Sequence, residues 1–418
     1  MRKVLSILLA CGLVLLCACG KQPQDGVTGN YKAAVAAIDS GDYRTAYDLL
    51  TNATDEPSKE LLSRFVFVPT TITSAIRGET YDMHFSTELT YDKKGNPLKR
   101  VRIDKGDKTE TVYTYDDNGR MIKQVATADD FTRTEDYAYD AAGRLIRHHR
   151  ADCHGSRIDE TTYTYVYDDK GNLTEEKRIS TYSDGDGDEV TTTYNYNEAG
   201  KITLEKTVFQ SGYWSEKATE YRADGTLYTM TERNSSSDEA YVVYEYDEQE
   251  RLWKEWIYPT DEEPYVKREY TYDKAGRVIK DFRFTGTTHY TYDEKGNLLC
   301  ETEESQKTTY TYDESGNCLT EARTGSVRDW SKQYTYDEKG NCLTDTTTYD
   351  YGLTENVTNT YDADGNRLTQ VYDGVSSETG KAITITENVA WTLFYYPNEV
   401  PEVVEEELYS LTIPPNAA

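Results

Sequence analysis

The chain has few aliphatic side chains and little positive charge. Hydrophobic residues make up 37% of its 418 residues, below the usual share for a globular domain, and 38 tyrosines supply much of that apolar surface. Because Leu, Ile and Val are sparse, we expect thin layers with large aromatic faces and no thick aliphatic core. Lys and Arg number 46 against 75 Asp and Glu, a formal net charge of −29. This balance argues against binding of DNA, RNA or anionic lipid by basic patches, and leaves cations and neutral polymers such as glycans as partners.

Motifs of common enzymes are also missing. No stretch resembles a nucleophile elbow, a phosphate-binding loop or a metalloprotease helix. We therefore expect no enzymatic activity and no cofactor.

Only the N-terminus carries a long hydrophobic run. Arg2 and Lys3 precede an apolar segment, residues 4–16, which is too short to span a bilayer as a mature helix and is typical of a secretory signal. Residues 16–20 read LCACG, which resembles the bacterial lipobox. We predict a signal peptide over residues 1–18, lipidation of Cys19 and a tether over 19–30. The protein would then be exported and held on the cell membrane, at the cell surface, by its lipid; an uncleaved anchor helix is the alternative.

The next segment, residues 31–66, changes to helical spacing. Tyr31, Ala34, Val35 and Ile38 recur at i, i+3, i+4 and i+7, and a second such run follows from Tyr43. Residues 41–46 (GDYRTA) between them resemble the inter-helix turn of a tetratricopeptide repeat. One unit cannot bury its own faces without neighbours. We expect a short helical hairpin that caps the first β-repeat, with a peptide-binding module as the alternative.

Self-similarity dominates residues 89–373. Twelve units recur at separations of 20 to 29 residues, and their central tyrosines are Tyr91, Tyr115, Tyr139, Tyr167, Tyr196, Tyr221, Tyr246, Tyr272, Tyr292, Tyr312, Tyr336 and Tyr361. Asp follows the tyrosine in ten units, the exceptions being Asn197 and Arg222. Glycine stands four places after the tyrosine in all units but the one with Glu250: Gly95, Gly119, Gly143, Gly171, Gly200, Gly225, Gly276, Gly296, Gly316, Gly340 and Gly365.

Each position of the repeat has a physical role, as residues 290–298 (YTYDEKGNL) illustrate. Tyr-Thr-Tyr favours a strand and places both tyrosines on one face. The Asp can accept hydrogen bonds from downstream amides and begin a type I turn. Glycine supplies a positive φ, which closes a three-residue hairpin loop with a bulge. We therefore predict one antiparallel hairpin per unit, and expect the unit with Glu250 to tolerate substitution better at that position.

Twelve hairpins give about 24 strands, and open twisted sheets rarely exceed about ten strands without curling or splitting. We predict a mainly β fold in which the hairpin array, residues 81–373, forms a curled or spiral sheet. Residues 374–418 would supply one or two closing strands, in the alternating stretch 383–396, and an acidic tail.

The twelve phased copies resemble the RHS/YD repeat of bacterial Rhs proteins, insecticidal toxin complexes and teneurins, over about two thirds of the chain. The resemblance implies a spiralling β-sheet that can enclose a hollow shell, and a link to carbohydrate binding. The chain departs from the toxin members because it has few repeats for a closed chamber. It also lacks a core-terminating protease motif followed by a toxin domain, which argues against a delivered toxin or toxin remnant.

Four cysteines follow the predicted lipidation site: Cys153, Cys300, Cys318 and Cys342. An even number in an exported protein suggests disulfides. Equivalent strands of consecutive hairpins, however, lie about 10 Å apart, whereas a disulfide requires Cα atoms within about 7 Å. We expect these thiols to act as small buried hydrophobic groups.

Two clusters are weak candidates for metal ligands. Asp184, Asp186 and Asp188 alternate as in a calcium loop, but the later positions of an EF-hand are not matched, so we expect a solvated hairpin tip. His149, Cys153 and His154 have suitable donor atoms without a standard spacing, and a loop is the simpler interpretation. We predict no metal.

Function is expected to be binding. The first hypothesis is a surface scaffold or adhesion protein that contacts a glycan, the cell wall or a protein through its aromatic sheet, with Tyr290, Tyr292, Tyr310 and Tyr312 as candidate contacts. These rings could equally be packing residues. The second hypothesis is a partial shell that sequesters a polypeptide cargo.

Overall fold

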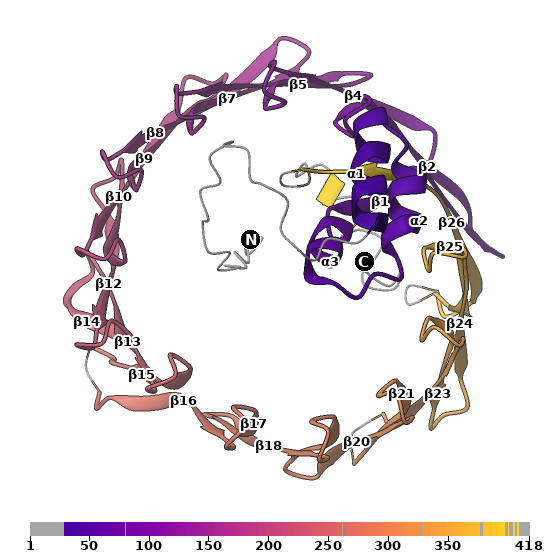
Figure 1. The fold of residues 1–418 in the computed structure, drawn as a ribbon. Coiled ribbons are helices and arrows are strands. Elements are labelled where there is room, and N and C mark those ends of the chain that lie inside the picture. The colour runs from indigo at the N-terminus through magenta and orange to yellow at the C-terminus, as the bar shows by residue number, and fades with distance from the viewer. Residues whose placement is uncertain are drawn as a thin grey trace. The chain divides into compact units, whose positions relative to one another are not determined.

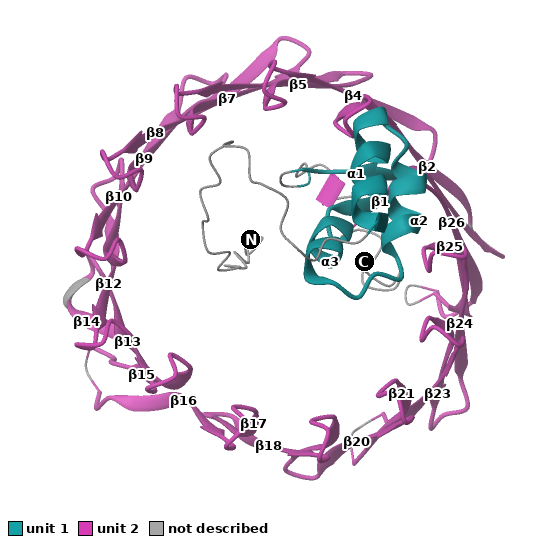
Figure 2. Ribbon diagram, viewed as in Figure 1, with its two compact units in different colours: residues 1–67, 393–400 teal, residues 68–392, 401–418 magenta. Residues whose placement is uncertain are grey.

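The computed structural model describes residues 29–400 except 80, 261, 326–327, 377–378 and 398–399, together with residues 404, 405 and 408. The chain divides into two compact units, residues 1–67 with 393–400 and residues 68–392 with 401–418 (Figure 2). The predicted signal peptide, Cys19 and nearly all of the tether and acidic tail lie outside the described residues.

The first unit contains three helices: α1 (Gly29–Ser40), α2 (Tyr43–Leu50) and α3 (Glu56–Leu62). Gly41 separates α1 from α2 with a φ of 79°, and the Asp42 carboxylate caps α2 by accepting the Thr45 amide proton at 3.1 Å. Helix α3 has no counterpart in the expected hairpin. In the described part of the chain, no helix is both long and apolar enough to cross a lipid bilayer.

The core of this unit is small and partly aromatic. Ala34, Ala46, Leu50, Leu61 and Phe65 are buried against one another. Ring contacts between α2 and the start of the following strand complete it, since the Tyr47 and Phe65 centroids lie 6.0 Å apart.

The rest of the fold is β-structure (Figure 1). The strands are β1 (Phe65–Gly78), β2 (Tyr81–Tyr91), β3 (Pro97–Asp104), β4 (Asp107–Tyr115), β5 (Met121–Ala128), β6 (Phe131–Tyr139), β7 (Leu145–His154), β8 (Arg157–Tyr167), β9 (Leu173–Thr181), β10 (Gly187–Tyr196), β11 (Ile202–Phe209), β12 (Trp214–Tyr221), β13 (Leu227–Asn234), β14 (Ser237–Tyr246), β15 (Leu252–Ile257), β16 (Tyr265–Tyr272), β17 (Val278–Arg283), β18 (Gly286–Tyr292), β19 (Leu298–Glu303), β20 (Gln306–Tyr312), β21 (Cys318–Thr324), β22 (Trp330–Tyr336), β23 (Cys342–Tyr349), β24 (Thr354–Tyr361), β25 (Arg367–Val375) and β26 (Ala382–Tyr395).

The predicted curled or spiral open sheet is wrong, because the sheet closes. Each strand pairs antiparallel with its neighbour in the sequence, and β1 also pairs with β26, which makes a closed barrel of 26 described strands. At this seam the Thr70 hydroxyl donates to the Ala390 carbonyl at 3.2 Å. Sequence reasoning missed β1, which precedes the repeats and lacks their motif. Once β1 and β26 pair, neither end of the array leaves an edge strand with unsatisfied backbone groups.

The repeat turns have the geometry that the glycine pattern requires. In the unit of Tyr292, the Asp293 amide donates to the Asn297 carbonyl and the Gly296 amide donates back to Asp293. The Asp293 carboxylate accepts the Asn297 amide proton at 2.8 Å. All eleven repeat glycines have positive φ, and Glu250 also adopts a φ of 58°, so the exceptional unit keeps the left-handed conformation without glycine.

A second irregularity recurs in every unit. Next to each central tyrosine the strand register shifts, so that one residue of the following strand has no direct partner. We call these twelve residues the bulge positions: Leu98, Ile122, Ile146, Thr174, Thr203, Tyr228, Trp253, Ile279, Leu299, Leu319, Leu343 and Leu368. Bulges re-aim side chains, and seven of the twelve are among the exposed large hydrophobic residues.

Candidate functional site

Two of the predicted ligand contacts, the central tyrosines Tyr292 and Tyr312, hold consecutive hairpins together. The Tyr292 hydroxyl donates to the Val278 carbonyl at 2.8 Å, and the Tyr312 hydroxyl donates to the Leu298 carbonyl at 2.9 Å. The acceptor in each case lies on the second strand of the preceding hairpin. Their hydroxyls are thus engaged in the array.

The same bond recurs along the barrel. Central tyrosines that donate to the preceding hairpin are Tyr139, Tyr167, Tyr196, Tyr221, Tyr272, Tyr336 and Tyr361. The bond explains why tyrosine, and not phenylalanine, stands at this position.

The other two predicted contacts, Tyr290 and Tyr310, each pack beside an acidic residue. Tyr290 lies directly opposite Glu301, and Tyr310 opposite Glu321. Burial, and to a lesser extent the negative charge of Glu321, raises the pKa of Tyr310 to about 12. These half-buried phenols stay neutral and belong to the packing of the tyrosine face, so Tyr290 and Tyr310 offer less surface than the sequence suggested.

The histidine and cysteine side chains that were weak candidates for metal ligands do not converge. The His149 ring bonds the Thr162 hydroxyl at 2.9 Å, whereas the tilted rings of His154 and Phe131 lie against each other with centroids 4.6 Å apart. Cys153 lies opposite Ile158. No group of three or more potential ligand side chains gathers anywhere in the described residues.

The three aspartates of the candidate calcium loop also do not converge. Residues 182–186 close a tight turn, in which the Asp184 carboxylate accepts the Asp186 amide proton at 3.2 Å. Asp188 lies in β10 and forms an ion pair with Arg178 at 2.8 Å. The three carboxylates therefore serve separate local roles.

The four described cysteines, Cys153, Cys300, Cys318 and Cys342, are all reduced and half-buried. Cys318 lies opposite Tyr312, and Cys342 opposite Tyr336, where other repeats carry aliphatic residues. Burial raises the pKa of both thiols, which makes them poor nucleophiles.

Two adjacent units depart from the repeat by carrying a charged residue of a different kind in the turn. Arg222 replaces the turn aspartate of one unit, and Glu250 replaces the turn glycine of the next. The Arg222 guanidinium donates to the carbonyls of Leu227 and Tyr246. The Glu250 carboxylate accepts the Leu227 amide proton at 2.6 Å. The two departures thus form one local network between adjacent hairpins.

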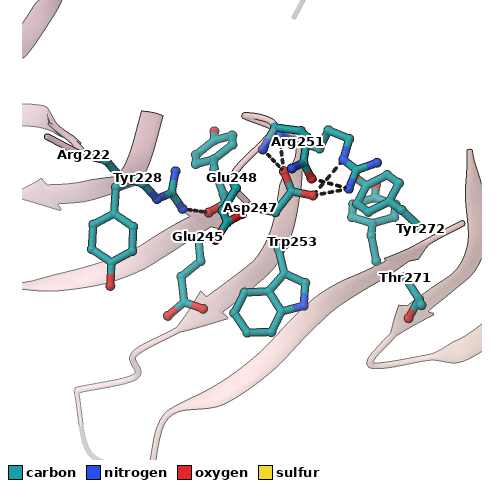
Figure 3. A pocket seen from close by; sticks show the side chains of 12 residues that line it. Arg222, Tyr228, Glu245, Asp247, Glu248, Arg251, Trp253, Thr271 and Tyr272 are labelled. Atoms are coloured by element: carbon teal, nitrogen blue, oxygen red, sulfur yellow. Dashed lines mark hydrogen bonds and ion pairs between the residues drawn. The ribbon is translucent and has the colours of Figure 1, made fainter. Parts of the chain in front are cut away.

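A cavity of about 580 Å³ lies beside this network, lined by residues of β13 to β16 and their turns. All twelve bulge positions are described, and two of them are aromatic, Tyr228 and Trp253. Both line the cavity. Tyr228 is 49% exposed and Trp253 is 42% exposed. In Figure 3 both rings project to the same side as Glu245 and Thr271, away from Arg251.

The spacing of the two rings follows from the strand register. Glu245 in β14 pairs with Thr229 in β13 and with Lys254 in β15. Tyr228 and Trp253 each directly precede one of these partners, so they lie at the same height on either side of β14. Two interstrand spacings separate them, which is about 10 Å.

Some charged side chains at the cavity already have hydrogen-bond partners, whereas others have none. Arg222 lies over one face of the Tyr228 ring at 5.0 Å and is held by two carbonyls. Burial favours a raised pKa for Asp247, but hydrogen bonds from Arg251 outweigh it and hold this pKa below its ordinary value. The side chains of Glu245 and Glu248, by contrast, form no hydrogen bond or ion pair with other described residues. Lys254 lies over the Trp253 ring at 4.6 Å and forms an ion pair with Glu269 at 3.7 Å, so the uncommitted polar groups that line the cavity are mainly acceptors.

Sequence reasoning singled out both departures, Arg222 and Glu250, but drew no site from them. The tryptophans do not recur with the motif, so the repeat pattern does not indicate Trp253 as a ligand contact. The signal that could have found the site was the pair of aromatic residues, Tyr228 and Trp253, each of which directly follows the residue opposite the central tyrosine in two adjacent units.

Comparisons with known proteins are weak. No family model and no curated protein sequence matches the chain. A crystal structure of TcdB2–TccC3–TEV is 14% identical over 76% of this chain, with a TM-score of 0.32, and the alignment covers 25% of that chain. Porin-like proteins from Bacteroides vulgatus and Bacteroides uniformis are 13% and 11% identical, over 40% and 78% of this chain and 93% and 96% of theirs, with TM-scores of 0.23 and 0.16. These scores are too low to carry an argument about the function of this chain.

Proposed function

We propose that the chain is an exported, lipid-anchored repeat protein of the RHS/YD type that binds a neutral glycan at the cavity of Tyr228 and Trp253. The observation that carries the proposal is the pair of exposed aromatic rings, one on each side of β14, in two adjacent units that depart from the repeat pattern. Large aromatic surfaces that are exposed to solvent favour a ligand with apolar faces and hydroxyl groups at its edges.

The polar groups support the same ligand class. Glu245 and Glu248 can accept hydrogen bonds from sugar hydroxyls, while Arg222 and Arg251 are already occupied. A polyanion would meet these carboxylates and the net charge of −29. The barrel scaffold fixes the strands that carry both rings, so the site is preorganised.

The test is a glycan array followed by titration calorimetry with any glycan that binds. We expect Trp253→Ala and Tyr228→Ala each to weaken binding at least about tenfold, which corresponds to about 1.4 kcal/mol, with an unchanged melting temperature. Leu319→Ala is the matched control, because Leu319 is an exposed bulge residue far along the array. Undiminished binding by both aromatic variants would place the ligand elsewhere.

Closure of the barrel favours a second candidate function, enclosure of a polypeptide. A closed ring of 26 strands has a circumference of at least about 125 Å and a diameter of at least about 40 Å, and barrels much smaller than this already leave internal space. Native mass spectrometry of protein from its own host tests the idea. A second polypeptide of constant mass and stoichiometry supports it, and the mass of the chain alone contradicts it.

A further inference from the structure

On the basis of the proposed function, the spacing of the Tyr228 and Trp253 rings narrows the class of glycan that can bind at the cavity. Tyr228 and Trp253 are held on strands separated by β14, about 10 Å apart. A single sugar ring cannot cover both. Two rings of one ligand must therefore be engaged, and the distance between them must match two interstrand spacings.

Extended β-1,4-linked glycans meet this requirement. Successive sugars in such a chain are turned by about half a revolution, so every second sugar presents the same face, and one disaccharide advances by roughly the distance between alternate strands. We infer that the site binds a neutral, extended β-1,4-linked oligosaccharide of at least three sugars, whose first and third rings stack on Tyr228 and Trp253.

The residue between the two rings accounts for the middle sugar. Glu245 projects on the same side as Tyr228 and Trp253 (Figure 3), and its carboxylate has no partner among the described residues. It therefore accepts hydrogen bonds from hydroxyls of the sugar that lies over β14. Thr271 continues the row on β16 and is exposed, so a fourth sugar finds a further hydroxyl there.

The geometry also predicts how the row ends. The bulge position before Tyr228 is Thr203, and the one after Trp253 is Ile279. Neither offers an aromatic face, so chain length beyond about four sugars should add little affinity.

The experiment is calorimetric titration of the purified protein with β-1,4-linked N-acetylglucosamine oligomers of one to six sugars. We expect affinity to rise at least about tenfold between two and three sugars, and to level off after four. For the trimer, Tyr228→Ala and Trp253→Ala should each remove this gain, so that the trimer binds no better than the dimer does to the unchanged protein. Leu319→Ala serves as the control and should keep the gain.

Two further ligands test extension and charge. An α-1,4-linked glucose oligomer, which curves, and a β-1,4-linked oligomer of uronic acids, which is anionic, should both bind at least about tenfold more weakly than the neutral β-1,4-linked oligomer of equal length. A dimer that binds as tightly as the tetramer, or equal binding of the curved or anionic oligomers, overturns the inference while leaving glycan binding intact. If none of these oligomers binds while a glycan found on the array does, the inference fails alone; if no glycan binds at all, the proposed function fails.

Discussion

The free-energy cost of the left-handed conformation in the repeat turns can be measured with alanine and glycine variants at two positions. Gly296 has a φ of 98°, and a Cβ placed there would lie 3.5 Å from the nearest other atom, an Arg277 side-chain nitrogen, which is an ordinary contact. The cost of Gly296→Ala is therefore almost entirely the backbone term, about 1–2 kcal/mol. Glu250 holds a φ of 58° at the equivalent position, so an alanine there carries a similar strain.

At Glu250 two effects must be separated. Glu250→Ala loses the hydrogen bond from the Leu227 amide and keeps the left-handed strain, whereas Glu250→Gly loses the same bond and relieves the strain. The difference between these two variants isolates the backbone term, and we expect the glycine variant to be more stable by about 1–2 kcal/mol. Because Glu250 shares the left-handed conformation, we expect this position to tolerate fewer substitutions than the sequence pattern predicts.

The assay is equilibrium unfolding in urea, followed by circular dichroism. Ala142→Gly is the matched control, because Ala142 lies in an equivalent turn without a positive φ, and it should gain no stability. A neutral Gly296→Ala, together with equal stability of the two Glu250 variants, refutes the account of the turns.

Three further predictions concern the ion pairs, the seam and the anchor. Asp281 is 1% exposed, and burial alone would raise its pKa, but Arg268 and Arg283 outweigh burial and hold the pKa below its ordinary value. Asp281→Asn should lower the free energy of unfolding by about 1.5–3 kcal/mol at pH 7. This difference between the two proteins should be complete above the unfolded-state pKa of about 3.9 and should disappear as the pH falls through the lower folded-state pKa. A difference that does not depend on pH would contradict the ion-pair account. Gly78→Ala places a Cβ 2.9 Å from a main-chain oxygen of β26, so we expect a lower melting temperature and faster amide exchange confined to the seam; uniform exchange along the array counts against the closed seam. Cys19→Ala should release the protein from the membrane fraction or leave it unprocessed, and a variant that stays membrane-bound and lipid-labelled shows that the lipobox prediction is wrong.

Much of the local structure could be predicted from the sequence, because each signal is local. The Tyr-Thr-Tyr strand, the turn aspartate and the left-handed glycine all act within one hairpin, and the helical spacing of residues 31–50 acts within α1 and α2. Closure could not be predicted in this way. It depends on pairing between β1 and β26, which are more than 300 residues apart and share no motif.

The candidate site shows the same limit. Arg222 and Glu250 are visible in the sequence as departures from the repeat. That Tyr228 and Trp253 stand at the same height, with Glu245 between them, depends on register shifts in two adjacent hairpins. A bulge moves the side chains that follow it to a different pairing, so simple alternation along the strand does not reveal which residues share a row.

The most direct test of the central claim is a crystal structure of the protein grown with the β-1,4-linked tetramer of N-acetylglucosamine. The account predicts sugar rings stacked on Tyr228 and Trp253, and a hydroxyl of the sugar between them within hydrogen-bonding distance of the Glu245 carboxylate. Sugar bound at another part of the barrel, or an empty cavity at a tetramer concentration well above its measured Kd, would contradict the account.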